Sequence, residues 1–292
     1  MLWALFTLIA AASQTVRNAT QRELTATLGT AGATHVRFLF GFPFALLFLA
    51  VVLLASGEAL PRPGMVYWTW VMDGALAQIA ATALMLAAMN ERSFVVVYAY
   101  IKTEPVQAAL FGLVFLGDAV TPAMAASILI ATTGVIVMAL KPGTTLAFKA
   151  TLLGVGAGAM FALSAVGFRG AILSLDLPNY VMAATYTMVI GLAIQVVLLS
   201  LYLRLRNPAV MRAIFRAWQP SMLAGFLGAL ASQFWFLAFA LATAASVRTL
   251  ALVEVLFAQA ISRFIFKQAT TAREAIGIVL IVLGVALLLW AS

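Results

Sequence analysis

VYAYIKTEPVQAALF, residues 97–111, and VRTLALVEVLFAQAI, residues 247–261, stand 150 positions apart and decide the fold. Each is an apolar run with one glutamate at the same place, Glu104 in the first and Glu254 in the second. Around them, residues 93–140 and 243–290 are identical at nine of 48 positions, including Gly134/Gly284. So few identities are weak in such an apolar chain, but acids inside membrane spans are rare and functional. The repeated acid therefore indicates a two-fold molecule with a central site.

The composition is that of an integral membrane protein. Of the 292 residues, 65% are hydrophobic and 9% are charged, whereas soluble domains have roughly 45–50% apolar and about 25% charged residues. Apolar segments long enough for the roughly 20 helical residues that cross a bilayer recur along the chain. The alternating pattern of an outer-membrane barrel does not occur. Because unsatisfied backbone cannot face lipid, the spans are expected to be α-helices.

The sequence excludes several other kinds of site. It has no cysteine and one histidine, His35, so neither a disulfide nor a His/Cys metal site is expected. No phosphate loop or nucleophile motif occurs, so we expect no cofactor and no catalytic residue. The net charge of +8 comes from cations spread over short loops, which is typical of topology determinants and not of nucleic-acid binding.

Charged residues, prolines and glycines divide the chain into ten predicted spans. These cover about residues 2–21, 28–55, 66–89, 93–116, 120–140, 148–173, 178–203, 218–242, 245–266 and 271–291. The longest loop, 204–217, is too short for a soluble domain. We predict two repeats of five spans within one membrane domain, residues 1–142 and 146–292. Since five is odd, the second repeat must insert in the opposite orientation, which predicts an all-α integral membrane fold with an inverted-topology repeat.

Loop cations predict the orientation of the chain. On one side the loops carry only Arg62, and on the other they carry Arg22, Arg92, Lys141, Lys149, Arg204, Arg206, Arg212, Arg216, Lys267 and Arg273. Cation-rich loops stay in the cytoplasm. We therefore expect a multi-pass protein of a bacterial inner membrane with both termini outside.

Charged residues inside the spans are candidates for a functional site, because each costs about 2.5–3.5 kcal/mol at the centre of a bilayer. They are Arg17, Arg37, Asp73, Lys102, Glu104, Arg169, Arg248, Glu254 and Arg263. Lys102 lies two residues from Glu104, and Arg248 lies six residues before Glu254. Neither spacing puts a pair on one helical face, so partners must come from other helices or from water. Alternatively, the acids only neutralise Arg17, Arg37 or Arg169 and lock helices together.

From these residues we predict a substrate site. Glu104 is expected to contact a substrate amine or to titrate, with Glu254 as a second titratable group of the same origin but a different role. The other candidates are cations for a carboxylate and polar or aromatic residues that shape the pocket: Arg17, Arg169, Arg248, Tyr98, Tyr100, Gln107 and Trp235. Pro105 removes a backbone donor and predicts a bend beside Glu104. Gly154 and Gly158 predict close helix packing and do not establish a dimer.

With these features the chain resembles the ten-helix EamA branch of the drug/metabolite transporter superfamily over its whole length. The marks of the resemblance are Arg37-Phe38, Pro105, and Gly117-Asp118 before Thr121 and Gly134-Val135. It implies a secondary transporter with a central cavity between the halves, often an exporter of amino acids or related metabolites. Asp118, Val255 and Lys267-Gln268 depart from the family pattern. The two glutamates lie outside that pattern, and the family's frequent cytoplasmic termini oppose the cation count.

The sequence therefore predicts a secondary active transporter that exports small polar metabolites, foremost amino acids, by alternating access. Its partners would be a small-molecule substrate and the lipid bilayer, without nucleic acid, and a monomer is expected. A cationic-drug or quaternary-amine exporter is the nearest alternative, although six basic against three acidic residues in the spans disfavour it. A channel and a membrane-embedded enzyme are the alternatives from other classes.

Overall fold

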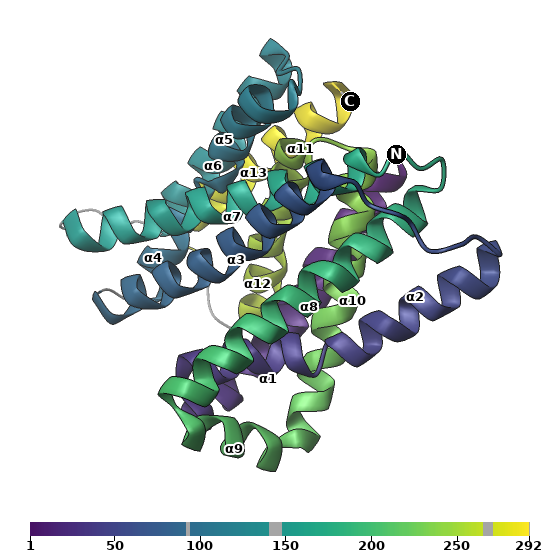
Figure 1. The fold of residues 1–292 in the computed structure, drawn as a ribbon. Coiled ribbons are helices and arrows are strands. Elements are labelled where there is room, and N and C mark those ends of the chain that lie inside the picture. The colour runs from purple at the N-terminus through teal and green to yellow at the C-terminus, as the bar shows by residue number, and fades with distance from the viewer. Residues whose placement is uncertain (92–93, 140–147, 265–270, 292) are drawn as a thin grey trace. The chain divides into compact units, whose positions relative to one another are not determined.

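The computed structural model of the chain describes residues 1–91, 94–139, 148–264 and 271–291. All elements in these ranges are helical, as predicted, and they contain no strand. They are α1 (Leu2–Leu39), α2 (Phe42–Ser56), α3 (Met65–Glu91), α4 (Phe94–Ile101), α5 (Glu104–Phe111) with a π-helical turn (Gly112–Leu116), α6 (Pro122–Ala139), α7 (Phe148–Ser174), α8 (Tyr180–Arg206), α9 (Pro208–Arg216), α10 (Trp218–Leu241), α11 (Ala244–Leu250) with a 3₁₀ turn (Ala251–Val253), α12 (Glu254–Phe264) and α13 (Ala272–Ala291) (Figure 1).

Helix length and composition confirm an integral membrane protein. Seven segments of the described chain are long and apolar enough to cross a bilayer: Ala31–Ser56, Met65–Glu91, Pro122–Ala139, Phe148–Ser174, Tyr180–Arg206, Ser221–Leu241 and Ala272–Ala291. Large apolar side chains such as Leu54 and Phe148 are 87% and 82% exposed, which suits a surface that faces lipid. The other three predicted spans are the first, the fourth and the ninth. The first is the beginning of α1, and the fourth and ninth correspond to the interrupted helices α4–α5 and α11–α12.

The chain forms two compact units. The first unit contains residues 1–76 and 167–241, and the second contains residues 77–166 and 242–292. Each unit takes residues from both predicted repeats. The long helices α3 and α7 each contribute residues to both units.

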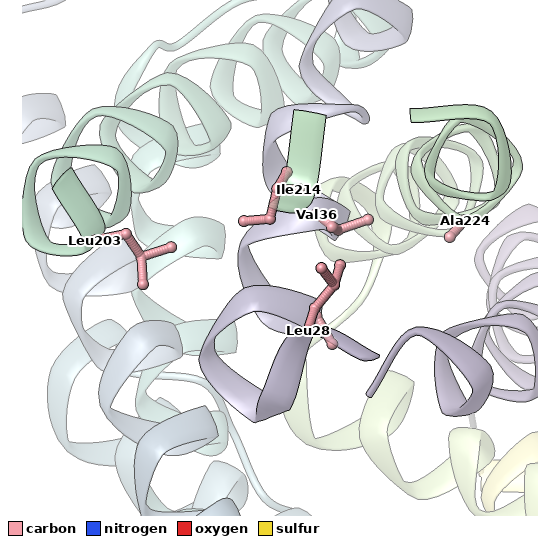
Figure 2. Packing of buried hydrophobic residues seen from close by; sticks show 6 residues of the cluster. Leu28, Val36, Leu203, Ile214 and Ala224 are labelled. Atoms are coloured by element: carbon pink, nitrogen blue, oxygen red, sulfur yellow. The ribbon is translucent and has the colours of Figure 1, made fainter. Parts of the chain in front are cut away.

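In the first unit, the loop predicted at residues 204–217 contains the short helix α9. Pro208 opens it at a position where a missing backbone N–H costs nothing. The inward face of α9 packs Ile214 into a cluster with Leu28 and Val36 of α1, Leu203 of α8, and Ala224 of α10 (Figure 2). Its outward face exposes Arg212, Phe215 and Arg216. The loop is therefore a packed element that joins α8 to α10.

In the second unit, α6 and α13 pack along one another through glycines. A Cβ on Gly134 would lie 2.9 Å from the Ile281 side chain, and a Cβ on Gly284 would lie 2.7 Å from Ala131. Only glycine permits so close an approach at these two places. Close packing of α6 against α13 therefore explains why both repeats have glycine at this position, Gly134 and Gly284.

Candidate functional site

The fourth predicted span is interrupted directly before Glu104. Helix α4 ends at Ile101, and α5 begins at Glu104. Pro105 follows and has no backbone N–H, so it cannot continue the helical hydrogen bonding to the carbonyl of Ile101. The Thr103 hydroxyl donates to the carbonyl of Tyr100 at 2.7 Å within the interruption. The bend predicted from Pro105 is therefore confirmed as a break between two helices.

The ninth predicted span is interrupted at the matching position. Helix α11 ends at Leu250, a 3₁₀ turn covers Ala251–Val253, and α12 begins at Glu254. No proline causes this second break, since Val255 stands where Pro105 stands in the first. Both glutamates thus open the second helical segment of their span.

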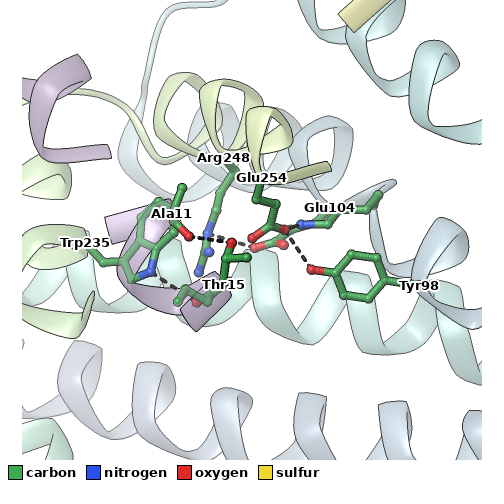
Figure 3. A network of polar contacts seen from close by, with 9 residues as sticks. Ala11, Thr15, Tyr98, Glu104, Trp235, Arg248 and Glu254 are labelled. Atoms are coloured by element: carbon green, nitrogen blue, oxygen red, sulfur yellow. Dashed lines mark hydrogen bonds and ion pairs between the residues drawn. The ribbon is translucent and has the colours of Figure 1, made fainter. Parts of the chain in front are cut away.

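The charged residues of the two interrupted spans pair crosswise (Figure 3). Arg248 Nε of α11 lies 2.8 Å from Glu104 Oε1 of α5. Lys102, between α4 and α5, forms an ion pair with Glu254 of α12. The Tyr98 hydroxyl of α4 donates to Glu254 Oε1 at 2.8 Å. The prediction that the partners come from another helix is confirmed, and the partners include Lys102, which the predicted site omitted.

This charged network is buried and balanced. Lys102 is 7% exposed, Glu104 6% and Glu254 5%, while the Arg248 side chain is 13% exposed. The Lys102 ammonium also lies 4.8 Å from the centroid of the Tyr98 ring. Removing one member of a buried pair typically costs about 3–5 kcal/mol, because the other charge is left uncompensated. The two acids and two cations therefore hold the interrupted spans together.

Helix α7 packs against the first interruption. Gln107 Nε2 donates to the carbonyl of Val155 at 3.2 Å. A Cβ on Gly154 would lie 2.7 Å from the Tyr100 side chain, and one on Gly158 would lie 2.9 Å from the carbonyl of Ile101. The close packing predicted for Gly154 and Gly158 is confirmed. Tyr100 and Gln107, two predicted pocket residues, make their contacts here with α7.

The remaining predicted site residues belong to the first unit. The Trp235 indole N–H of α10 donates to Gln14 Oε1 at 3.3 Å, and Arg169 Nη1 of α7 donates to the carbonyl of Phe239 at 2.6 Å. Arg17 is buried beside Gly228. The structure thus brings Tyr98, Glu104, Arg248 and Glu254 together in the second unit.

Some residues used in the sequence analysis lie outside the described part of the structure. These are Arg92, Lys141 and Lys267-Gln268, together with the side chains of Arg22 and Arg263. Among the described residues, no group of three or more His, Asp or Glu side chains could hold a metal ion.

The comparisons with known proteins identify a fold and no function. No protein-family model matches the chain, and no curated protein matches it. A solved structure described only as "Crystal structure of protein" is similar, with a TM-score of 0.70 and 18% sequence identity. The match covers 98% of this chain and 99% of the other. At this identity the likeness extends to the fold over the full length of both chains.

Proposed function

We propose that the chain is a secondary active transporter that exports small polar metabolites, foremost amino acids, by alternating access. The observation that carries the proposal is the pair of spans interrupted 150 positions apart, each with a buried glutamate at its break. Interrupted helices that present charges and helix ends inside the membrane bind substrates and ions in secondary transporters. The resemblance to the EamA branch adds to this proposal.

Reciprocal contacts support the two-fold repeat on which alternating access depends. Tyr98 contacts Glu254, and the equivalent positions Arg248 and Glu104 contact each other. Gly134 approaches Ile281, and the equivalent positions Gly284 and Ala131 approach each other. A two-fold axis generates such pairs, because residue i meets j and j meets i across it. We therefore retain ten spans and the repeats 1–142 and 146–292 as part of the proposal.

The charges of the interrupted spans suit a zwitterionic substrate. The amine of an amino acid would bind a carboxylate of the network, and its carboxylate would bind a cation there. Such a substrate exchanges one set of ion pairs for another, which avoids leaving a buried charge uncompensated. The protein would act as a monomer in a bacterial inner membrane.

Counterflow in liposomes tests the proposal. Purified protein is reconstituted in vesicles loaded with unlabelled amino acids, and uptake of the labelled compounds is measured over a range of concentrations. We expect saturable uptake that Glu104→Gln reduces at least about tenfold, as expected when an interaction worth roughly 1.4 kcal/mol or more is lost. The matched control is Glu91→Gln, because Glu91 pairs with Lys149 at the surface at 2.6 Å.

Two outcomes would contradict the proposed function, and a third would contradict the role of Glu104. Uptake that rises linearly without saturation would indicate a channel. Saturable uptake of tetraalkylammonium ions but of no amino acid would favour the cationic-drug exporter. Unchanged rate and pH dependence in Glu104→Gln would remove Glu104 from the mechanism.

A further inference from the structure

The two glutamates have partners that differ in kind. In the reciprocal contacts, Glu104 meets the guanidinium of Arg248, whereas Glu254 meets the neutral hydroxyl of Tyr98. Lys102 forms an ion pair with Glu254. The repeat counterpart of Lys102 is Leu252, a buried apolar residue. Lys102 is therefore an addition to the two-fold pattern, and it supplies a cation to Glu254.

The two cations also differ chemically. A guanidinium is a planar, delocalised cation with five N–H donors, and Arg248 approaches Glu104 with its Nε at 2.8 Å. A lysine ammonium is compact and sits on a flexible four-carbon chain, and it is chemically the same group as the amine of a substrate. Lys102 lies in the turn between α4 and α5, and its backbone N–H donates to the carbonyl of Tyr98 at 3.0 Å, so displacement of its ammonium needs only rotation of the side chain.

From these differences we propose that Glu254 and Tyr98 form a binding site for a primary ammonium group, which Lys102 occupies in this structure and a substrate ammonium takes over. The Glu254 carboxylate accepts hydrogen bonds from the ammonium, and the Tyr98 hydroxyl holds that carboxylate in place at 2.8 Å. The Tyr98 ring, 4.8 Å from the Lys102 nitrogen, adds a cation–π contact. A quaternary ammonium lacks N–H donors and would not replace Lys102. Access of the substrate to this site rests on the proposed function.

Displacement of Lys102 sets a charge requirement on the ligand. Once displaced, the Lys102 ammonium needs a new anion, since an uncompensated buried charge is costly. A zwitterion supplies a carboxylate for Lys102 together with the ammonium for Glu254, so both buried charges stay paired. A simple alkylammonium supplies no carboxylate. The site of the unmodified protein should therefore reject propylammonium, and a variant without Lys102 should accept it.

Thermal unfolding of the purified full-length chain tests this inference with propylammonium chloride as the probe. Lys102→Ala should lower the Tm, and propylammonium should restore most of that loss in a saturable manner. Sodium chloride and tetramethylammonium chloride at equal ionic strength should not. The unmodified protein should not respond. The double variant Lys102→Ala with Glu254→Gln, which lacks the carboxylate, should not respond either.

A surface lysine provides the matched control. Lys149→Ala removes an exposed lysine that also pairs with a glutamate, Glu91, and propylammonium should leave its Tm unchanged. If Lys102→Ala yields no folded protein in sodium chloride, it is purified in propylammonium chloride instead. Folded protein only in propylammonium supports the inference, and failure in both salts overturns it.

The inference is overturned if propylammonium does not raise the Tm of Lys102→Ala. It is also overturned if tetramethylammonium, or the variant without the Glu254 carboxylate, gives the same rise. Its failure is separate from failure of the proposed function. Saturable amino-acid uptake without propylammonium rescue contradicts only the ammonium site, whereas rescue without saturable uptake contradicts only transport.

Discussion

At the scale of the residue, the spacing of charges along the chain predicted the kind of partner but not its identity. Lys102 and Glu104 are two residues apart and do not share a helical face, which predicts partners from other helices or from water. Which helix supplies them depends on tertiary packing, so the sequence alone does not single out Lys102 as a partner. The sequence did contain a signal for the other two partners. Tyr98 and Arg248 occupy equivalent positions in the two repeats, each six residues before a glutamate, Glu104 or Glu254.

Gly158 gives a test at this scale. A Cβ there would lie 2.9 Å from the carbonyl of Ile101 and 3.0 Å from Gln107 Oε1, so α7 would have to shift. Gly158→Ala should destabilise the protein by about 1–3 kcal/mol, as overpacking does, seen as a lower Tm. Gly156→Ala is the control, since its Cβ would meet only Leu84 at an ordinary 3.8 Å. Equal Tm values for the two variants would show that α7 does not pack tightly at the break.

At the scale of the element, hydropathy located the spans well and their internal breaks poorly. The ends of α3, α7 and α13 fall within a few residues of the predicted limits, because long apolar runs between polar loops define them. The break beside Pro105 was predicted as a bend. The equivalent break before Glu254 has no proline to mark it and was missed.

The sequence predicts a loop at residues 204–217 where the structure has helix α9. The nine residues of α9 include two arginines, and two further arginines, Arg204 and Arg206, precede the helix. Its apolar residues recur at helical spacing, Val210 and Ile214, but so short a run resembles any polar loop. In the structure Ile214 belongs to the cluster of Figure 2, and Val210 packs against that cluster.

Ile214 tests whether α9 stabilises the first unit. Ile214→Ala removes a fully buried side chain and should cost about 2–5 kcal/mol, measured as faster thermal inactivation in detergent. Phe215→Ala, one position on, removes a side chain that is 58% exposed and should change stability little. A larger effect at Phe215 would contradict the orientation of α9.

At the scale of the whole molecule, the membrane class was predictable from composition, while the two compact units were not. The units combine residues from both predicted repeats, and no local pattern reports such long-range association. The reciprocal contacts of the second unit offer more support for a two-fold design than nine identities in 48 positions do.

Membrane orientation can be measured directly because the chain has no cysteine. Arg216→Cys on α9 and Arg62→Cys before α3 each place one exposed thiol in a loop region. With both termini outside, a membrane-impermeant maleimide should label Arg62→Cys in intact cells and should label Arg216→Cys only after the cells are opened. The reverse pattern would place both termini in the cytoplasm.

The unequal partners of the two glutamates have a consequence for the resting protein. In a transporter built from inverted repeats, the inward-open and outward-open states arise when one repeat rocks against the other around a fixed site. If equivalent positions carried the same residues, the two states would have equal free energies and equal populations. Tyr98 and Arg248 break that equality at the central contacts. Substitutions that make these two positions alike should remove this one source of the free-energy difference between the two states.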